Sequence, residues 1–226
     1  MEEKIKEFYN KRIKILGEKE FDSNINEKDV SGKMIFEFLK DKIKGKNKRI
    51  LDAGCGDCRF SRYFIENGYK IICMDFAEEN LRIAKKNIGK GNFVVGSVMK
   101  IPFEDKYFDF IFTVDVFQHV QDLKKAIREF HRVLKKDGIL IIIDKNKLGI
   151  HSKYFIPQKL IKFHKDKTRL KYSGFKERWF YPNEIKRLTN NLFSQSEHRY
   201  LIEKNKSKIF HLFPQLNLFM AWVAKK

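Results

Sequence analysis

Apolar residues along the chain follow two alternating patterns. Short, nearly continuous apolar runs are separated by stretches in which apolar residues recur every three or four positions. The runs predict strands that are buried on both faces, and the spaced stretches predict amphipathic helices. The predicted strands span residues 49–53, 70–75, 92–97, 108–115 and 138–144, and the helices between them span residues 58–67, 77–88 and 122–134.

This alternation of strand and helix predicts an α/β fold in which a mostly parallel sheet is doubly wound, with helices on both faces. In such sheets, ligands bind at the carboxyl ends of the strands, near the point where the strand order reverses. The sequence therefore places a candidate site in the turns that follow the predicted strands.

The segments that flank this core differ from it in character. Residues 1–47 are polar and helical, and one apolar stripe there predicts a core-facing helix that ends near Gly45. The stripe consists of Met34, Ile35, Phe38, Leu39 and Ile43. Residues 145–181 break the rhythm, because lysines and arginines alternate with aromatic side chains. A further helix is predicted at 182–190, and the last strands at 199–202 and 218–224.

Charge narrows the range of partners. The 226 residues include 48 Lys and Arg against 29 Asp and Glu, which gives a net charge of +19. Such a chain attracts nucleic acid, an anionic membrane surface or a phosphorylated substrate. A lysine-rich surface that is merely solvated is an equal alternative.

Three cysteines are too few, and odd in number, for a disulfide framework, which indicates a reducing compartment. The N-terminal residues are charged, so no signal peptide is predicted. No apolar run approaches the roughly 18 residues of a membrane span. We therefore expect a cytoplasmic protein.

Two features suggest where a ligand binds. The turn after the first strand reads DAGCGDCR from Asp52 to Arg59, and its glycines let the backbone lie against a ligand. A dinucleotide-binding turn would need glycine at position 59, so Arg59 argues against a dehydrogenase. Asp75 ends the second strand, where a carboxylate can accept both hydroxyls of a ribose. The alternative role for Asp75 is to cap the next helix.

Four ordered motifs carry a family resemblance: LDAGCGDCRFSRYF, IICMDFAEENLRIAKKN, GSVMKIPFEDKYFDFIF and VFQHVQDLKKAIREFHRVLKKDGIL. Residues 49–144 resemble a class I S-adenosylmethionine-dependent methyltransferase, of the group similar to ubiquinone- and menaquinone-biosynthesis methyltransferases. The resemblance implies a Rossmann-like, seven-stranded sheet with an antiparallel last strand, and S-adenosylmethionine as cofactor.

The resemblance also implies roles for individual residues. The methionine end of the cofactor would be cradled by Asp52, Gly54, Cys55 and Gly56. Asp75 would hold the ribose and Phe76 would flank the adenine. Ser97 and Val98 would line the adenine edge, and the backbone of Thr113 and Val114 would lie near the sulfonium.

Two positions depart from the family pattern. Cys58 stands where the family usually has a third glycine, and Ser97 stands where it usually has aspartate. A hydroxyl accepts a hydrogen bond more weakly than a carboxylate does, so these changes bear on cofactor affinity.

The length of the chain suggests a single domain over residues 1–226. Residues 1–47 would form a helical lid that carries Tyr9 and Arg12, and residues 48–144 the cofactor-binding core. Residues 145–181 would form a basic, aromatic cap over the acceptor, and residues 182–226 the last helix and strands.

No metal site is predicted. Cys55 and Cys58 form a C-x-x-C pair, but the sequence shows neither a second pair nor a nearby histidine to complete it. Asp115, Gln118 and His119 stand where some relatives bind a divalent ion, but the middle carboxylate is replaced by an amide. His119 could instead serve as a general base toward the acceptor. A structural role at the turn is the favoured alternative for this histidine.

The expected function is methyl transfer to a small-molecule or lipid-like, anionic acceptor. RNA methylation is the alternative, favoured by the net charge. Against RNA, the chain lacks the Asn/Asp-Pro-Pro-aromatic run of base-amine methylators and a Pro-Cys nucleophile. A non-catalytic nucleotide-binding module is the third possibility.

Overall fold

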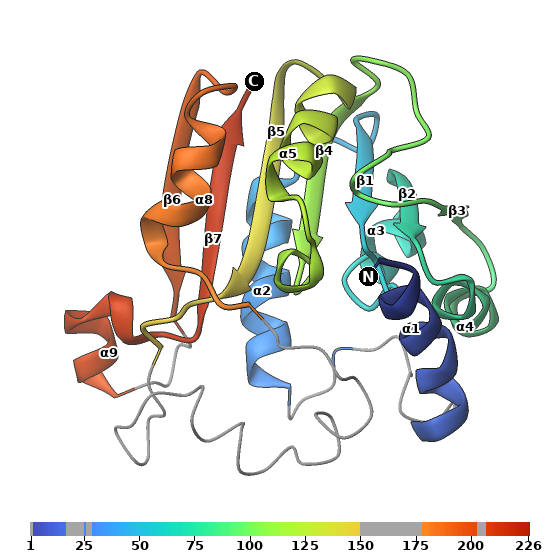
Figure 1. The fold of residues 1–226 in the computed structure, drawn as a ribbon, viewed down its shortest axis with the longest axis horizontal. Coiled ribbons are helices and arrows are strands. Elements are labelled where there is room, and N and C mark those ends of the chain that lie inside the picture. Colours follow the sequence, from blue (N-terminus) through green and yellow to red (C-terminus); the bar gives the residue numbers. More distant parts are fainter. Residues whose placement is uncertain (1, 17–24, 26–28, 150–177, 203–206) are drawn as a thin grey trace.

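The computed structural model describes residues 2–16, 25, 29–149, 178–202 and 207–226. Its strands are β1 (Arg49–Ala53), β2 (Lys70–Asp75), β3 (Asn92–Val95), β4 (Phe108–Val114), β5 (Leu134–Lys145), β6 (Gln195–Leu201) and β7 (Phe219–Lys225). They form one sheet in the order β3-β2-β1-β4-β5-β7-β6 (Figure 1). β7 pairs antiparallel with both of its neighbours, β5 and β6, and the other strand pairs are parallel. The predicted mostly parallel sheet with an antiparallel last strand is therefore confirmed.

Helices cover both faces of the sheet (Figure 1). One face packs against α2 (Val30–Lys42), α3 (Arg62–Glu66) and α4 (Glu78–Ile88), and the other against α5 (Leu123–Val133) and α8 (Pro182–Thr189). Adjacent residues of β1 belong to different cores, because Ile50 packs on the α2 side and Leu51 on the α5 side. Burial of both faces explains why the strands read as nearly continuous apolar runs.

Aspartate side chains cap two of the helices. The Asp122 carboxylate accepts a hydrogen bond from the Lys125 N–H at 2.9 Å and caps α5. Asp29 caps α2 in the same way, by accepting from the Gly32 N–H at 2.9 Å. In the predicted apolar stripe, Ile35, Leu39 and Ile43 are fully buried.

Four predicted elements differ from the structure. The strand predicted at 138–144 begins four residues earlier, at Leu134, as β5. The helix predicted at 58–67 is reduced to α3, because Cys58 has a φ of 63° and stands in a turn. The strand predicted at 92–97 ends at Val95. The strand predicted at 199–202 begins four residues earlier as β6, an edge strand with one exposed face whose polar residues masked it.

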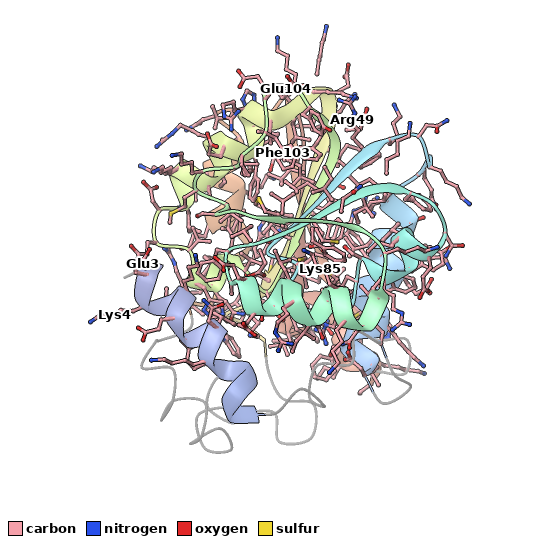
Figure 2. The ribbon with its side chains drawn as sticks, turned by 90° about the vertical axis from the view of Figure 1, so that its right-hand side faces the viewer. Glu3, Lys4, Arg49, Lys85, Phe103 and Glu104 are labelled. Atoms are coloured by element: carbon pink, nitrogen blue, oxygen red, sulfur yellow. The ribbon has the colours of Figure 1, made fainter. Side chains whose placement is uncertain are left out.

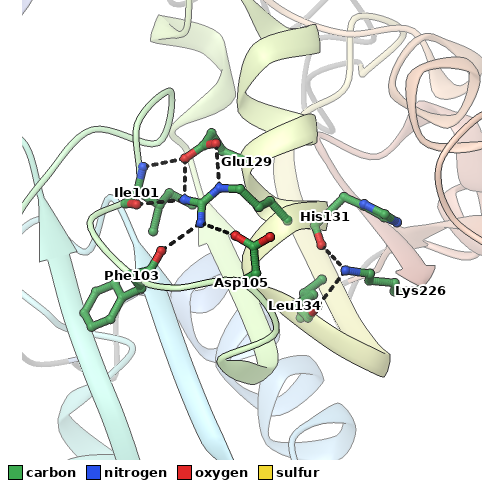
Figure 3. A network of polar contacts seen from close by, with 8 residues as sticks. Ile101, Phe103, Asp105, Glu129, His131, Leu134 and Lys226 are labelled. Carbon is green, nitrogen blue, oxygen red and sulfur yellow. Dashed lines mark hydrogen bonds and ion pairs between the residues drawn. The ribbon is translucent and has the colours of Figure 1, made fainter.

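Arg132 on α5 binds the loop between β3 and β4 to this helix (Figure 3). Its guanidinium donates to the carbonyl oxygens of Ile101 and Phe103, at 2.9 and 2.8 Å, and to the Asp105 carboxylate at 2.9 Å. Glu129 orients the guanidinium through two hydrogen bonds and also accepts from the Ile101 N–H. The loop that leaves β3 is therefore held to α5 by charged hydrogen bonds.

We expect Arg132→Ala to lower the free energy of unfolding by about 2 kcal/mol, because hydrogen bonds to a charged group are lost and two carbonyl oxygens lose their donor. Chemical denaturation would measure the change. Arg128→Ala is the matched control, since Arg128 is exposed one turn earlier on the same helix. Equal losses in both variants would show that the network contributes nothing specific.

The N-terminal helix α1 (Glu2–Leu16) lies beside α4 (Figure 2). The Asn10 side-chain oxygen accepts a hydrogen bond from the Glu79 N–H at 3.2 Å, in the first turn of α4. Lys6 lies 3.5 Å from Glu78 in the same turn. Residues 17–24 and 26–28, between α1 and α2, lie outside the described residues.

The remaining short elements are the 3-10 helices η2 (Phe117–His119) and η3 (Pro214–Leu216) and the helix α9 (Lys208–Leu212). None of the helices that the structure describes combines the length and the apolar character needed to cross a membrane.

Candidate functional site

A pocket of about 390 Å³ opens where β1 and β4 end, the point at which the strand order reverses. Its volume lies within the ~300–1,000 Å³ range of small-molecule sites. Every site residue predicted from the sequence lines this pocket except Thr113: Asp52, Gly54, Cys55, Gly56, Asp75, Phe76, Ser97, Val98, Val114 and His119.

The glycine turn has a backbone that side chains would disturb. The N–H groups of Gly54 and Cys55 both donate to the Met74 carbonyl oxygen, at 2.7 and 3.0 Å. Gly54 has a φ of +82°, and a Cβ there would lie 2.4 Å from Val116. Gly56 also has a positive φ, and no atom lies within 4 Å of where its Cβ would be. The backbone at Gly56 is thus open to a ligand in the pocket.

Asp75 is buried and held by three donors. Its carboxylate accepts from the Gly56 N–H at 2.9 Å, the Ala77 N–H at 2.8 Å and the Asn80 amide at 3.2 Å. Burial raises the pKa of this carboxyl, and the backbone hydrogen bonds oppose that rise. Asp75 therefore joins the glycine turn to the segment before α4, but it does not cap that helix, because Ala77 is the N-cap residue and no side chain caps it.

Asp52 lies beneath the turn, at the end of β1, and is 3% exposed. The Ser61 hydroxyl donates to its carboxylate at 2.5 Å. Burial raises the pKa of Asp52 well above the usual value, with a contribution from nearby Cys73. The carboxyl group thus stabilises the segment from β1 to α3.

Beyond the turn, Ser97 and Thr113 occupy different surroundings. The Ser97 side-chain oxygen accepts from the Met99 N–H at 3.2 Å, within the loop that Arg132 fastens. Thr113 is 1% exposed, and its Oγ1 has no hydrogen-bond partner among the described residues. The side chain of Thr113 is therefore buried beneath the pocket wall rather than lining it.

A charged cluster lines the pocket where β4 and β5 end, and the sequence singled out its Asp115 and Gln118 but not Lys145. The Lys145 ammonium donates to the Gln118 side-chain oxygen at 2.8 Å and lies 3.3 Å from the Asp115 carboxylate. Lys145 is only 2% exposed. Asp115 has a φ of 58°, a left-handed conformation that a non-glycine residue adopts only under constraint. The signal was the lysine that follows Asp144 at the end of the apolar run of β5.

Asp144, next to Lys145, is fully buried and supports the same turn. Its carboxylate accepts from the backbone N–H groups of Gln118, at 3.2 Å, and Lys145, at 2.8 Å. Burial, with Asp115 nearby, raises the pKa of Asp144 to about 8. The folded chain therefore holds a proton that the unfolded chain releases at about pH 3.9.

Stability should consequently fall as the pH rises from about 4 to about 8, because the folded state binds the extra proton throughout that window. Asp144→Asn removes the ionisation. We expect the variant to gain stability relative to wild type with each step from pH 5 to pH 8, as measured by denaturant unfolding. If the free energy of unfolding changed with pH equally in both proteins, the raised pKa of Asp144 would be contradicted.

Helix α1 closes one side of the pocket through Ile5 and Tyr9. The Tyr9 hydroxyl lies 2.9 Å from His119 Nε2, and the Tyr9 ring packs 5.9 Å from the ring of Phe76. His119 is thus brought to the pocket and joined to α1 by a hydrogen bond. Arg12, the other N-terminal residue singled out in the sequence, has no described side chain.

The two ends of the predicted cap meet at the pocket edge. The Phe180 N–H donates to the Lys145 carbonyl oxygen at 3.0 Å, and the Lys147 N–H donates to the Phe180 carbonyl oxygen at 2.9 Å. The Arg178 N–H donates to the Gln118 carbonyl oxygen at 3.3 Å. Residues 150–177, which hold most of the predicted basic cap, lie outside the described residues.

Arg59 is a second pocket residue that the sequence did not assign to the site. Its guanidinium pairs with Asp29 at 3.1 Å and stacks over the ring of Phe60 at 4.6 Å. The sequence used Arg59 only to argue against a dinucleotide turn, although a cation next to a ligand-binding turn is itself a signal.

Comparison with known proteins identifies the middle of the chain. Residues 51–142 match the family model described as a methyltransferase domain. Malonyl-[acyl-carrier protein] O-methyltransferase of Hamiltonella defensa is 31% identical over 96 residues, which are 42% of this chain and 37% of that protein. Ubiquinone biosynthesis O-methyltransferase of Pelagibacter ubique is 33% identical over 106 residues, 45% of this chain and 44% of that protein. The chain thus spans less than half the length of both relatives.

Similarity in fold to solved structures covers most of the chain. A solved S-adenosylmethionine-dependent methyltransferase of Thermotoga maritima, described as a possible histamine N-methyltransferase, superimposes with a TM-score of 0.64 at 20% identity. The superposition covers 87% of this chain and 89% of that one. Residues 51–142 of this chain therefore resemble a methyltransferase domain, and the chain shares the fold of this solved S-adenosylmethionine-dependent methyltransferase.

Proposed function

We propose that this chain is an S-adenosylmethionine-dependent methyltransferase that acts on a small-molecule acceptor. One observation carries the proposal: the glycine turn and the start of α4 hold the Asp75 carboxylate at the wall of the pocket, inside the matched domain. A carboxylate in this position is suited to the hydroxyls of a ribose.

The residues present fit this cofactor. Open space above Gly56 lets the backbone approach the methionine end. Arg59 lines the same end, and its guanidinium matches a carboxylate in charge and geometry. Phe76 offers a ring to the adenine, and Ser97 and Val98 line its edge.

When bound, S-adenosylmethionine supplies a methyl group already activated by its sulfonium. The protein then has to align the acceptor with that group and exclude water. We assign the acceptor to the end of the pocket lined by Asp115, Gln118 and Lys145, because this end lies beyond the turn and Asp75. Helix α1 would exclude water there through Ile5 and Tyr9.

An oxygen acceptor is the first candidate, because the two curated relatives are named O-methyltransferases. A hydroxyl acceptor must lose its proton during transfer. His119 is our candidate general base, with Tyr9 2.9 Å from its Nε2. In the alternative, that hydrogen bond only anchors α1 over the pocket, and His119 is structural.

The anionic or lipid-like nature of the acceptor is a further part of the proposal. It rests on the basic and aromatic composition of residues 145–181. The ends of that segment reach the pocket edge at Gln118 and Lys145, which supports a position over the acceptor. Peripheral contact with an anionic membrane would use the same residues.

Calorimetry with S-adenosylhomocysteine tests the cofactor, with NAD as the matched control. We expect binding of S-adenosylhomocysteine and none of NAD, because Arg59 replaces the third glycine of a dinucleotide turn. Preferential binding of NAD would overturn the proposal. Incubation with labelled S-adenosylmethionine and a metabolite extract would then show whether the methyl group is transferred.

The net charge of +19 is the observation that favours RNA as a second candidate acceptor. The same labelled assay with total RNA distinguishes the two. Label in RNA but not in the metabolite fraction would replace the small-molecule proposal with RNA methylation.

A further inference from the structure

The three cysteines of the sequence come together in the fold. Cys55 lies in the glycine turn, Cys58 follows it by three residues, and Cys73 is on β2. Their sulfur atoms all lie within 4.8 Å of one another. The sequence had left the C-x-x-C pair without a third ligand, and the pairing of β1 with β2 supplies one.

The backbone of the turn holds Cys58 close to Cys55. The Cys58 N–H donates to the Cys55 carbonyl oxygen at 2.9 Å, which closes the turn. Cys58 has a φ of 63°, in the left-handed region that costs a non-glycine residue about 1–3 kcal/mol. A thiol is thus held in a conformation better suited to glycine, with its side chain completely buried.

Three clustered thiols are a ligand set for soft cations. Thiolate sulfur favours Zn²⁺, Cd²⁺ and Cu⁺ over hard cations, which prefer oxygen. Sulfur atoms placed tetrahedrally at about 2.3 Å from a zinc ion lie about 3.8 Å from one another. Sulfurs within 4.8 Å therefore need shifts of about 1 Å or less to share one ion.

The cluster lies against the pocket. Cys58 and Cys73 are 0% exposed, but Cys55 is 8% exposed and lines the pocket between Gly54 and Gly56. Cys55 is therefore the member of the cluster that borders the pocket, and Cys58 and Cys73 lie behind it, out of contact with solvent. A disulfide would use two of the thiols and leave the third unexplained.

We propose that Cys55, Cys58 and Cys73 bind one thiophilic cation, of the Zn²⁺ or Cd²⁺ kind, directly beneath the glycine turn. Binding replaces three S–H bonds with three sulfur–metal bonds and releases the protons to solvent. The bound ion joins β2 to the turn that follows β1, so it stiffens one wall of the pocket.

The test uses the full chain, reduced and stripped of metal, and titrated with Cd²⁺. We expect one ion per chain, an ultraviolet thiolate-to-metal absorption that saturates at that ratio, and protection of all three thiols from a thiol reagent. A reduced chain that binds no Cd²⁺, or that keeps three reactive thiols when loaded, overturns the proposal.

Cys73→Ala is the decisive variant, because it removes one sulfur and leaves the C-x-x-C pair intact. We expect Cd²⁺ affinity to fall by about 100-fold or more, since loss of even a supporting partner costs about 10–100-fold. Asp57→Asn is the matched control in the same turn and should bind as wild type does. Unchanged Cd²⁺ affinity in Cys73→Ala would show that the ion binds only to Cys55 and Cys58, and would overturn the three-cysteine site. If Cys73→Ala does not fold, Cys73→Ser takes its place. The number of thiols that Cd²⁺ protects in the wild-type chain then shows whether all three cysteines bind the ion.

Discussion

Asp75→Ala should weaken binding of S-adenosylhomocysteine by about 1.5–3 kcal/mol, which is roughly a 10- to 150-fold higher Kd. The reason is the loss of the charged acceptor that we assign to the ribose hydroxyls. Calorimetry on the folded variant would measure the change. Unchanged affinity would contradict the assignment of Asp75 to the cofactor.

The structure adds a complication that the sequence alone did not reveal. Asp75 also accepts hydrogen bonds from Gly56, Ala77 and Asn80, so alanine leaves these donors unpaired. Asp75→Asn keeps one acceptor oxygen and the size of the side chain, and it separates the two effects. A thermal unfolding curve of each variant shows how much of the weaker binding follows from a loosened turn.

Lys145→Met should lower the free energy of unfolding by about 1–3 kcal/mol, because a hydrogen bond from a charged donor is lost at a buried position. The Asp115 carboxylate would lose its cation, and the Gln118 side-chain oxygen its donor. If the acceptor lies at this end of the pocket, methyl transfer should fall further than the loss of folded protein explains. Denaturant unfolding and an activity assay at matched folded fraction measure both effects.

Lys136→Met controls for the loss of a lysine, since Lys136 is exposed on the same strand. The double variant Asp115→Asn/Lys145→Met completes a double-mutant cycle, in which removal of both charges should recover part of the lost stability. Additive losses would show that Asp115 and Lys145 do not interact.

Most strands could be predicted because strands that are buried on both faces consist of nearly continuous apolar residues. β1 and β2 have the predicted limits, and Asp75 and the glycine turn could be found because each directly follows such a run. β6 was harder, because an edge strand with one exposed face carries few apolar residues.

Contacts between distant segments could not be predicted from the sequence alone. The Tyr9–His119 hydrogen bond spans 110 residues, and the Cys73 sulfur meets Cys55 only through the register of β1 and β2. Lys145 was not singled out in the sequence, yet its ammonium is paired inside the pocket wall. Such contacts depend on how helices and strands pack, which local pattern does not encode.

The paired ends of the segment after β5 have a consequence for how this scaffold can be re-engineered. Backbone hydrogen bonds join residues 145–147 to Phe180, so the core itself closes the loop that leaves and re-enters there. Doubling the length of a closed loop costs only about 0.6 kcal/mol. Segments of different length can therefore be inserted between residues 147 and 180 at little cost in stability. The glycine turn is part of the connection between β1 and α3, so a change in its length would disturb the sheet.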